Sequence, residues 1–323
     1  MAGNPEPLTM YYKDKVPDLQ RLFGTEDVVV EADAVAIDGH RHTIRDDVIL
    51  MLPERPSEAG FAPRIQDTFG REWTTYHRIL PEHRPEFEAY FDLIDLPKLA
   101  DAMVCDLGCG MGRHSWFLAP WCRRLVLVDF SEAIFVARRN LAEVDHAIFV
   151  MADVTRLPFA DDSFDFAFSL GVLHHLPVDA LDTVRALERL APHLLIYLYY
   201  ALDNRPAYFR ALLRAVTAVR RRTAGIDSER ARAVITQLIA YGVYGPLSRL
   251  GGAARRIGRE AWVPLGEAYA GKSMPRIRQD VYDRFFTSIE QRVSREQILS
   301  LERDFSRVRI AESPPYWHFE CRR

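Results

Sequence analysis

The apolar residues between positions 103 and 200 follow two kinds of spacing. Short, nearly continuous apolar runs, typical of buried strands, alternate with stretches in which apolar residues recur every three or four positions, as in helices. The expected strands are 103–108, 124–129, 147–153, 164–171 and 193–200, and the expected helices between them are 112–122, 131–144 and 179–191. Ser131 is placed to cap the second of these helices. This order predicts a doubly wound α/β domain with a mostly parallel sheet covered on both faces.

The segments on either side have other patterns. Residues 1–60 alternate around an Asp38-Gly39 turn signal and predict a small β-rich module. Residues 61–100 predict one or two helices, in which Trp73 and Tyr76 either pack internally or form a lid over a ligand.

The regular alternation stops after residue 200 and resumes near the end of the chain. Residues 201–280 predict inserted helices, and residues 294–305 predict a further helix. The last segment, 308–323, predicts two strands around Pro314-Pro315 that pair antiparallel at one edge of the sheet. We therefore expect a module at 1–60 and a domain at 61–323 with an insertion at about 201–280.

Composition adds constraints without changing this picture. A hydrophobic content of 48% over 323 residues is enough for a full core, and 42 basic against 45 acidic residues give a net charge of −3, which indicates neither a nucleic-acid nor a membrane partner. The four cysteines form no C-x-x-C pair, and no uncharged run is long enough to cross a bilayer. We expect a soluble protein in a reducing, cytoplasmic setting without a structural metal.

A glycine-rich turn, VCDLGCGMGRH at residues 104–114, lies between the first expected strand of the domain and its helix. Such a turn lets a ligand approach the backbone, and the exposed N–H groups at the helix start favour an anionic group. A dinucleotide site requires G-x-G-x-x-G, but Arg113 stands at the third position. Asp106, two residues before a G-x-G-x-G, suits instead a ligand that carries an ammonium group.

The segment Asp106 to Gly112 resembles the first motif of class I S-adenosylmethionine-dependent methyltransferases, and residues 152–177 are similar to the same family's third-to-fourth-strand region. The resemblance implies a Rossmann-like methyltransferase fold: seven strands, mostly parallel with an antiparallel last strand, and here a helical insertion after strand 5. It implies S-adenosylmethionine as the cofactor. The first 60 residues resemble the zinc-ribbon-like segment that precedes many bacterial members, but they lack its cysteines.

Acidic residues at the ends of successive strands complete the expected cofactor site. Asp129 is placed to accept hydrogen bonds from both ribose hydroxyls, with Phe130 as an apolar face for adenine. Asp153 is placed to accept from the adenine amino group, and the Val154 N–H to donate to the ring. The predicted cofactor-binding residues are Asp106, Gly108, Cys109, Gly110, Gly112, Arg113, Asp129, Phe130, Asp153, Val154, Ser169 and Leu170.

His174 and His175 follow the fourth strand at the same edge of the sheet. Either can act as a general base on an acceptor hydroxyl, with His174 favoured because the nearer residue has the shorter reach. The alternative is a bracing role for the loop, since many family members carry a similar His-His-Leu. His114 is expected on the surface or in helix packing.

The inserted helices contain an excess of arginine. Between residues 205 and 260 there are twelve arginines, no lysine and three acids, which gives 12 − 3 = +9. Three interpretations stay open: a cap with its arginines in solvent, an acceptor pocket whose inward arginines bind a phosphate or carboxylate, or attachment to an anionic membrane surface through basic amphipathic helices. The arginines are 205, 210, 214, 220, 221, 222, 230, 232, 249, 255, 256 and 259.

Taken together, these patterns predict a methyltransferase that acts on oxygen or nitrogen of a small molecule, such as a natural-product, sugar or lipid intermediate, with or without an anionic group. One alternative is a cofactor-binding partner subunit without catalysis. A nucleic-acid methyltransferase is disfavoured, because Ser169-Leu170-Gly171-Val172 stands where such enzymes carry an Asn/Asp-Pro-Pro-Tyr/Phe tetrapeptide. The sequence predicts no oligomeric state.

Overall fold

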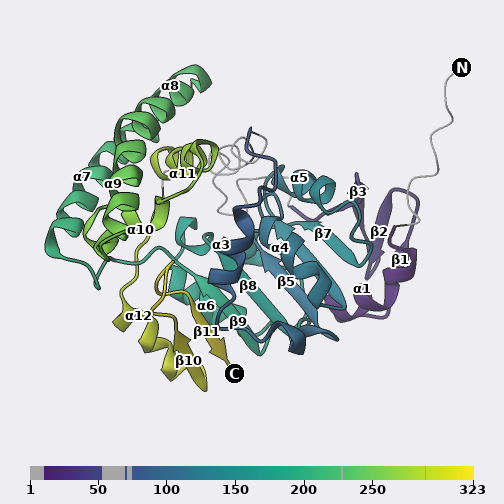
Figure 1. Cartoon of the computed structure of the whole chain (residues 1–323). Coiled ribbons are helices and arrows are strands. Elements are labelled where there is room, and N and C mark those ends of the chain that lie inside the picture. The colour runs from purple at the N-terminus through teal and green to yellow at the C-terminus, as the bar shows by residue number, and fades with distance from the viewer. Residues whose placement is uncertain (1–10, 53–69, 71–74, 227, 288) are drawn as a thin grey trace, which may run out of the picture.

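A computed structural model describes residues 11–52, 70, 75–226, 228–287 and 289–323 (Figure 1). Its strands are β1 Val28–Val30, β2 Ala34–Ile37, β3 His40–Arg45, β4 Val48–Leu50, β5 Met103–Leu107, β6 Arg124–Asp129, β7 Ala147–Met151, β8 Phe166–Leu170, β9 His193–Tyr197, β10 Arg307–Ile310 and β11 Phe319–Arg322. Its α-helices are α1 Val16–Phe23, α3 His83–Tyr90, α4 Arg113–Leu118, α5 Ala133–Asn140, α6 Ala180–Leu187, α7 Ala207–Thr223, α8 Glu229–Ile239, α9 Gly245–Arg255, α10 Gly266–Tyr269, α11 Met274–Phe286 and α12 Arg295–Leu299. Trp73 lies outside the described residues.

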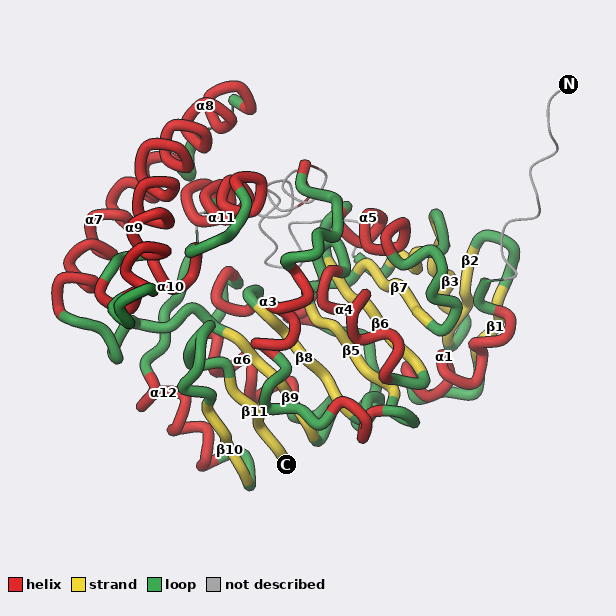
Figure 2. The backbone as a smooth tube through the Cα atoms, in the orientation of Figure 1, coloured by secondary structure: helices red, strands yellow, loops and turns green. Residues whose placement is uncertain are grey.

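The centre of the molecule is a twisted sheet surrounded by helices (Figure 2). Strands β7, β6, β5, β8 and β9 pair in parallel in that order, and β11 joins β9 antiparallel with β10 at the outer edge. Along β6, Leu125 and Leu127 pack with α3, α4 and α5 on one face, while Val126 and Val128 pack with α1, α6 and α12 on the other. Both faces are therefore buried, and the predicted doubly wound fold is confirmed.

The sheet is wider than the seven predicted strands. Strands β1–β4 extend it to eleven, because β4 pairs in parallel with β7, with Ile49 opposite Val150. The predicted Asp38-Gly39 turn joins β2 and β3, and both residues have positive φ. The Tyr12 hydroxyl donates to the Asp47 carbonyl at 2.6 Å and accepts from the Phe149 N–H at 3.2 Å. The β-rich segment thus continues the main sheet, and its standing as a separate module stays a prediction.

The inserted helices gather on one side of the sheet, away from β1–β4 (Figure 1). Helices α7–α11 follow β9, as predicted, and share a core of their own that includes Tyr244, Ile277 and Phe286. A π-helical stretch, Ala240–Tyr244, joins α8 to α9. Tyr76 packs against Tyr282 of α11, with ring centroids 6.3 Å apart. We call residues 207–286 the cap.

The N-cap residue of helix α5 lies one position after the predicted one, Ser131. Glu132 is at the N-cap position, and the helix begins at Ala133. The Ser131 hydroxyl donates instead to Asp129 at 2.7 Å, while it accepts from the Ala133 N–H at 3.3 Å. Ser131 therefore supports the carboxylate at the end of β6 as well as the start of the helix.

The glycine turn between β5 and α4 is fixed by packing as well as by backbone conformation. Gly108, Gly110 and Gly112 all have positive φ. A Cβ atom on Gly108 would lie 2.5 Å from Cγ1 of Val172 in the loop after β8, and one on Gly112 would lie 2.7 Å from Leu141. Glycine is required at these two positions because neighbouring protein atoms, rather than only a ligand, occupy the space.

We expect Gly108→Ala to destabilise the fold more than Gly39→Ala. Both positions have positive φ, which costs an alanine about 1–2 kcal/mol. In the described part of the chain a Cβ on Gly39 meets no atom within 4 Å, whereas Gly108→Ala adds about 1–3 kcal/mol of overpacking against Val172. Urea denaturation of the two variants measures the difference. In the Gly108→Ala background, Val172→Ala should recover the unfolding free energy that was lost to overpacking. Equal losses for the two glycines would contradict the packing argument.

Candidate functional site

Two buried carboxylates stand where β5 and β6 meet the glycine turn. Asp106 accepts a hydrogen bond from the Ser115 hydroxyl at 2.6 Å, and Asp129 accepts from the Gly110 N–H and the Ser131 N–H, each at 2.9 Å. The side chains are 4% and 6% exposed, and no cation of the described residues forms an ion pair with either. Burial, with a contribution from Asp129, raises the pKa of Asp106 to about 7, and burial also raises the pKa of Asp129.

A third carboxylate lies at the end of β7. Asp153 is half-buried, and one of its oxygens accepts from the Thr155 N–H and hydroxyl, both at 2.8 Å. Phe130, Val154 and Leu170 line the same cavity as the three acids. The structure thus brings together the predicted polar and apolar residues along one edge of the sheet.

Not every predicted cofactor residue reaches this cavity. Asp106, Gly108, Cys109, Arg113, Asp129, Phe130, Asp153, Val154 and Leu170 line it. Gly110 and Gly112 do not line it, but their positive φ angles set the path of the turn. Ser169 is fully buried, and its hydroxyl donates to the Leu107 carbonyl at 2.8 Å, so this side chain joins β8 to β5.

The cavity continues from the sheet edge into the cap and has a volume of about 1230 Å³. Near the sheet it is lined by the carboxylates, and farther away by apolar side chains of α7 such as Phe209, Leu213 and Val216. Single-ligand sites typically measure about 300–1,000 Å³. The space is therefore large enough for two ligands side by side.

The histidine pair divides between the cavity and the protein interior. His175 lines the cavity, and its Nδ1 lies 2.7 Å from the Ile289 carbonyl. Because a carbonyl only accepts, Nδ1 carries the hydrogen and Nε2, 3.9 Å from Asp283 Oδ1, is the basic nitrogen of the neutral ring. Asp283 in turn accepts from the Tyr199 hydroxyl at 2.7 Å.

His174 is fully buried and does not line the cavity. Its ring stacks on Tyr199 with centroids 3.9 Å apart, and its Nδ1 accepts from the Tyr199 N–H at 3.4 Å. Burial, together with His175 and Arg292, lowers the pKa of His174 well below its usual range. The expectation that His174 is the better placed of the pair is therefore wrong, because the loop turns it inward.

His114 also differs from expectation. Instead of lying on the surface or serving only helix packing, it is 7% exposed and lines the cavity. Its ring meets Tyr90 edge-on, and its Nε2 accepts from Arg113 Nε at 3.2 Å. Burial, reinforced by Arg113, lowers the pKa of His114 well below its usual range.

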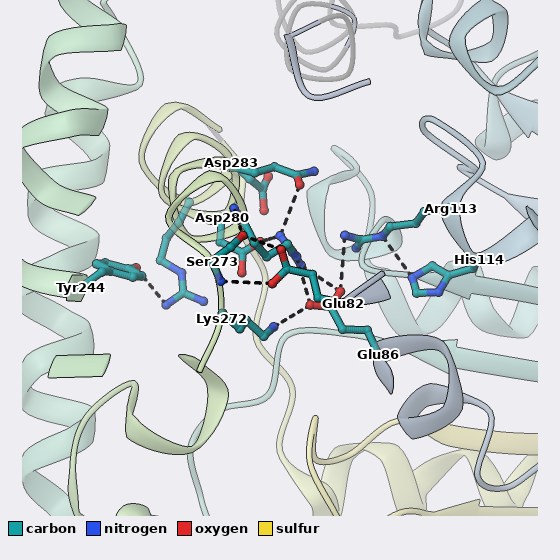
Figure 3. Close-up of polar contacts among 12 residues, drawn as sticks. Glu82, Glu86, Arg113, His114, Tyr244, Lys272, Ser273, Asp280 and Asp283 are labelled. Atoms are coloured by element: carbon teal, nitrogen blue, oxygen red, sulfur yellow. Dashed lines mark hydrogen bonds and ion pairs between the residues drawn. The ribbon is translucent and has the colours of Figure 1, made fainter. Parts of the chain in front are cut away.

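A buried ionic cluster joins the sheet domain to the cap. Glu86 of α3 accepts from Arg276 of α11 through both oxygens, at 3.0 and 3.2 Å, and from Lys272 at 2.7 Å. Figure 3 shows Lys272, just before α11, and Arg113, at the start of α4, both directed at Glu86. The Arg113 Nη1 atom lies 3.8 Å from Glu86 Oε2. Burial would raise the pKa of Glu86, but Arg276, Arg113 and Lys272 outweigh it and hold that pKa well below its usual range. Asp280 pairs with Arg276 as well.

Arg284, two turns farther along α11, lines the cavity in a different environment. Its Nη1 donates to the Tyr244 hydroxyl at 3.3 Å, and its Nε is buried without a hydrogen-bond partner among the described residues. No described carboxylate lies within 4.0 Å of its guanidinium. Burial opposes the charged form, but Tyr244, Tyr269, Tyr199 and, more weakly, the carboxylate of Glu290 raise the pKa of Arg284, so the group stays charged.

Most of the arginines between residues 205 and 260 are exposed on the surface. Nine of the twelve in residues 205–260 are exposed, and the other three are held by protein groups. Arg205 pairs with Glu267, Arg220 donates to the Thr287 carbonyl, and Arg232 donates to the Ile226 carbonyl and the Tyr282 hydroxyl. These three arginines are thus held by groups of the protein, while Arg205 and the exposed Arg255 also line the cavity.

The sequence reasoning missed the cavity residues that come from the cap and from α3. Glu86, Asp283 and Arg284 belong to segments with no recognisable motif, so no local signal could have found them. Tyr197 and Tyr199 had a usable signal, because they stand at the carboxyl end of a predicted parallel strand, where ligands of such sheets bind. No helix among the described residues is both long and apolar enough to cross a membrane.

Comparison with known proteins places this site in a family. A family model described as "Methyltransferase domain" matches residues 104–194. The chain is 47% identical over 68 residues to a demethylmenaquinone methyltransferase of Clavibacter sepedonicus, covering 21% of this chain and 28% of that protein. It is 29% identical over 155 residues to a tRNA U34 carboxymethyltransferase of Shewanella pealeana, covering 46% and 43%. The chain thus spans less than half the length of these curated relatives.

Among solved structures, one similar chain is the N-methyltransferase NodS of Bradyrhizobium japonicum in complex with S-adenosyl-L-homocysteine. It is 24% identical, with a TM-score of 0.34, and the alignment covers 41% of this chain and 72% of that one. The family match starts at β5 and its glycine turn and ends in β9, so it contains the three carboxylates at the sheet edge. Residues 104–194 therefore form a methyltransferase domain, and S-adenosylmethionine is its cofactor.

Proposed function

We propose that the protein transfers a methyl group from S-adenosylmethionine to an oxygen or nitrogen of a small-molecule acceptor. The observation that supports this most is the single cavity that joins the carboxylates of the sheet edge to the apolar and tyrosine-rich interior of the cap. A cofactor at the sheet edge leaves space beside it for an acceptor enclosed by α7 and α11. A cofactor-binding subunit without catalysis would need no such second compartment.

The residues at the sheet edge fit the cofactor. Asp106 and Asp129 are buried carboxylates that no described cation neutralises, and an ammonium group on a ligand would stabilise the ionised form of Asp106. In this proposal Asp129 binds the ribose hydroxyls, Asp153 and the Val154 N–H bind adenine, and Phe130 packs on the ring. The bound cofactor supplies a methyl group made electrophilic by a positively charged sulfur.

The chain's contribution to the reaction is alignment. Methyl transfer requires the acceptor's lone pair opposite the leaving sulfur, and holding two reactants in that geometry can lower a barrier by about 7–11 kcal/mol. Apolar side chains of α7 line the acceptor compartment, and the ionic cluster around Glu86 keeps α11 against the sheet domain. For a hydroxyl acceptor, we propose His175 Nε2 as the general base, with the Ile289 carbonyl fixing the ring's tautomer.

The acceptor in this proposal carries an anionic group that Arg284 binds. The Arg284 side chain is partly exposed, but its Nε is buried without a hydrogen-bond partner among the described residues, so an anionic group of a ligand would be favourable there. The tyrosines around it leave a compartment suited to an apolar body with one carboxylate or phosphate.

A nucleic-acid acceptor is the second candidate. It is favoured by the similarity to a protein named tRNA U34 carboxymethyltransferase and by the exposed arginines of the cap. It is weakened by the enclosed, largely apolar acceptor compartment and by the absence of the tetrapeptide typical of nucleic-acid methyltransferases. Methylation of a tRNA transcript, with no methylation of apolar small acids, would support this candidate instead.

Cofactor affinity should rise with pH through the titration of Asp106. A carboxyl with a pKa of about 7 in the free protein must be ionised to bind an ammonium group, so affinity is half of its full value near pH 7, approaches the full value at higher pH and falls at lower pH. Between pH 7.5 and pH 6 we expect the dissociation constant to increase about eight-fold, from the change in ionised fraction. Isothermal calorimetry measures this. Asp106→Asn should bind weakly at both pH values, and a slope equal to wild type in that variant would exclude Asp106 as the titrating group.

Replacement by asparagine should reduce turnover much more at His175 than at His174. His175→Asn keeps an N–H for the Ile289 carbonyl but removes Nε2, so with a hydroxyl acceptor we expect turnover to fall about 10²–10⁴-fold while cofactor affinity is kept. His174→Asn keeps an acceptor near the Tyr199 N–H and should change turnover only a few-fold. Single-turnover kinetics with radiolabelled cofactor compares them. Equal rates for both variants and wild type would leave the pair only a bracing role.

Arg284 and Arg276 should respond differently to replacement by glutamine. Arg276→Gln leaves Glu86 partly uncompensated and should cost about 3–5 kcal/mol of unfolding free energy, whereas Arg284→Gln removes a cation without an ion pair and should leave stability unchanged or increased. Arg284→Gln should also raise KM about 10–100-fold for acceptors with a carboxylate or phosphate, the size of a lost charged hydrogen bond. Urea denaturation and steady-state kinetics test both parts. A large stability loss in Arg284→Gln would show that its partner is part of the protein.

A further inference from the structure

Exposed apolar side chains gather on the inserted helices. Of fourteen large apolar residues that are exposed in the described chain, ten lie between residues 208 and 262, and only four lie in the rest of the described chain. The most exposed are Ile257 at 71%, Leu238 at 68% and Trp262 at 65%. Soluble monomers rarely leave a large apolar patch in water, and such patches mark interaction sites. We call these ten residues the cap surface.

Helix α8 shows that the exposure follows helical order. Val234 and Leu238 of α8 and Tyr241 of the π-helical stretch that follows it are spaced four and three residues apart, as on one side of a helix. The buried residues of α8, Arg232 and Thr236, are each two positions from Val234 or Leu238 and so lie on the opposite side, where Arg232 bonds to Tyr282 of α11. Helix α8 therefore packs on α11 with one side and exposes apolar side chains on the other, and Figure 1 shows the helix extending beyond its neighbours.

The same helices carry the nine exposed arginines, and they have few acids to offset them. The segment 205–260 has a formal charge of +9, against −12 for the rest of the chain. In a symmetric dimer, a second copy of the chain would meet this surface with the same positively charged face. RNA phosphates would match the arginines but would gain little from aliphatic side chains such as Leu238 and Ile257. An anionic lipid bilayer satisfies both, because its headgroups attract arginine and its acyl boundary takes up apolar side chains.

The cap surface is continuous with the cavity. Leu212, Val219 and Val243 are each more than two-fifths exposed and also line the cavity. An apolar molecule that leaves a bilayer at this point can reach the acceptor compartment along side chains that are apolar throughout.

We propose that the cap surface docks on an anionic membrane and that the acceptor is an amphiphile that enters the cavity directly from the lipid phase. The outer part of α8 inserts its exposed apolar side chains below the headgroups, and the arginines at the end of α7 and the start of α8 bind lipid phosphates. The entry route rests on the proposed methyl transfer, whereas the docking does not depend on it.

Co-sedimentation of the full chain with vesicles tests the docking without cofactor or acceptor. We expect binding to phosphatidylcholine vesicles that contain phosphatidylglycerol and little binding to phosphatidylcholine alone. The triple variant Arg221→Gln, Arg222→Gln, Arg230→Gln should weaken binding roughly 100-fold, from about 5-fold per arginine near an anionic surface. Leu238→Ser should weaken it about ten-fold or more by removing a buried leucine side chain from the acyl boundary.

The matched control replaces three exposed arginines of the sheet domain, Arg139, Arg303 and Arg307, by glutamine and should bind vesicles like wild type. Calorimetry with S-adenosylmethionine verifies that each variant is folded, and it separates a failure of docking from a failure of cofactor binding. The proposal is overturned if anionic vesicles do not bind, or if the control loses as much binding as the cap variants. It is also overturned if the cap variants instead abolish tRNA binding, or if Leu238→Ser only disperses a dimer.

Discussion

Charge buried beside the carboxyl edge of the sheet is the constraint on which the site depends. A charged group removed from water is tolerated only if another charge or several hydrogen bonds compensate it. The protein meets this condition for Glu86, which holds Arg276 and Lys272 and so fastens α11 to α3. Among the described residues, no ion pair compensates Asp106, Asp129 or Arg284, although Asp129 accepts three hydrogen bonds and Asp106 accepts one. We interpret these charges, uncompensated by any ion pair, as the groups that receive the charged ends of the ligands.

The signs of these uncompensated charges are ordered in space. The two carboxylates belong to the parallel strands, where the cofactor's cationic end is expected, while the guanidinium belongs to the cap, where the acceptor is expected. An amphiphile with an anionic group would therefore be drawn to the cap side and repelled from the cofactor side. His175, from the loop at the sheet edge, lines the cavity beside Asp283 of α11, so the residue proposed as general base lies where the sheet domain meets the cap.

The sequence predicted the part of the structure that local patterns encode. The five parallel strands, their helices and the acids at their ends were all visible, because a strand buried on both faces is apolar throughout and its end is marked by the first polar residue. The pairing of β4 with β7 was not visible, since Ile49 and Val150 are a hundred residues apart and any apolar strand could occupy that edge. The same limit applies to the histidines: adjacency in sequence could not show that the loop turns His174 inward and leaves His175 at the cavity. The glycine turn was recognised correctly, but contact with Val172 also explains why Gly108 must be glycine.

The boundary of the family match has a physical meaning. It ends at residue 194, before the cap begins, so the matched portion carries the chemistry of the cofactor while the acceptor compartment is closed by helices outside it. Those helices have arginines on their surface and no lysine between residues 205 and 260. Arginine binds phosphate through two parallel hydrogen bonds and is more weakly hydrated than lysine, which makes it the better residue for contact with lipid headgroups. A cap that only covered an active site could use either residue, or acids, on its outer face. The excess of arginine between residues 205 and 260, together with exposed apolar side chains that lead into the cavity, connects the choice of acceptor with the surface from which we propose that it arrives.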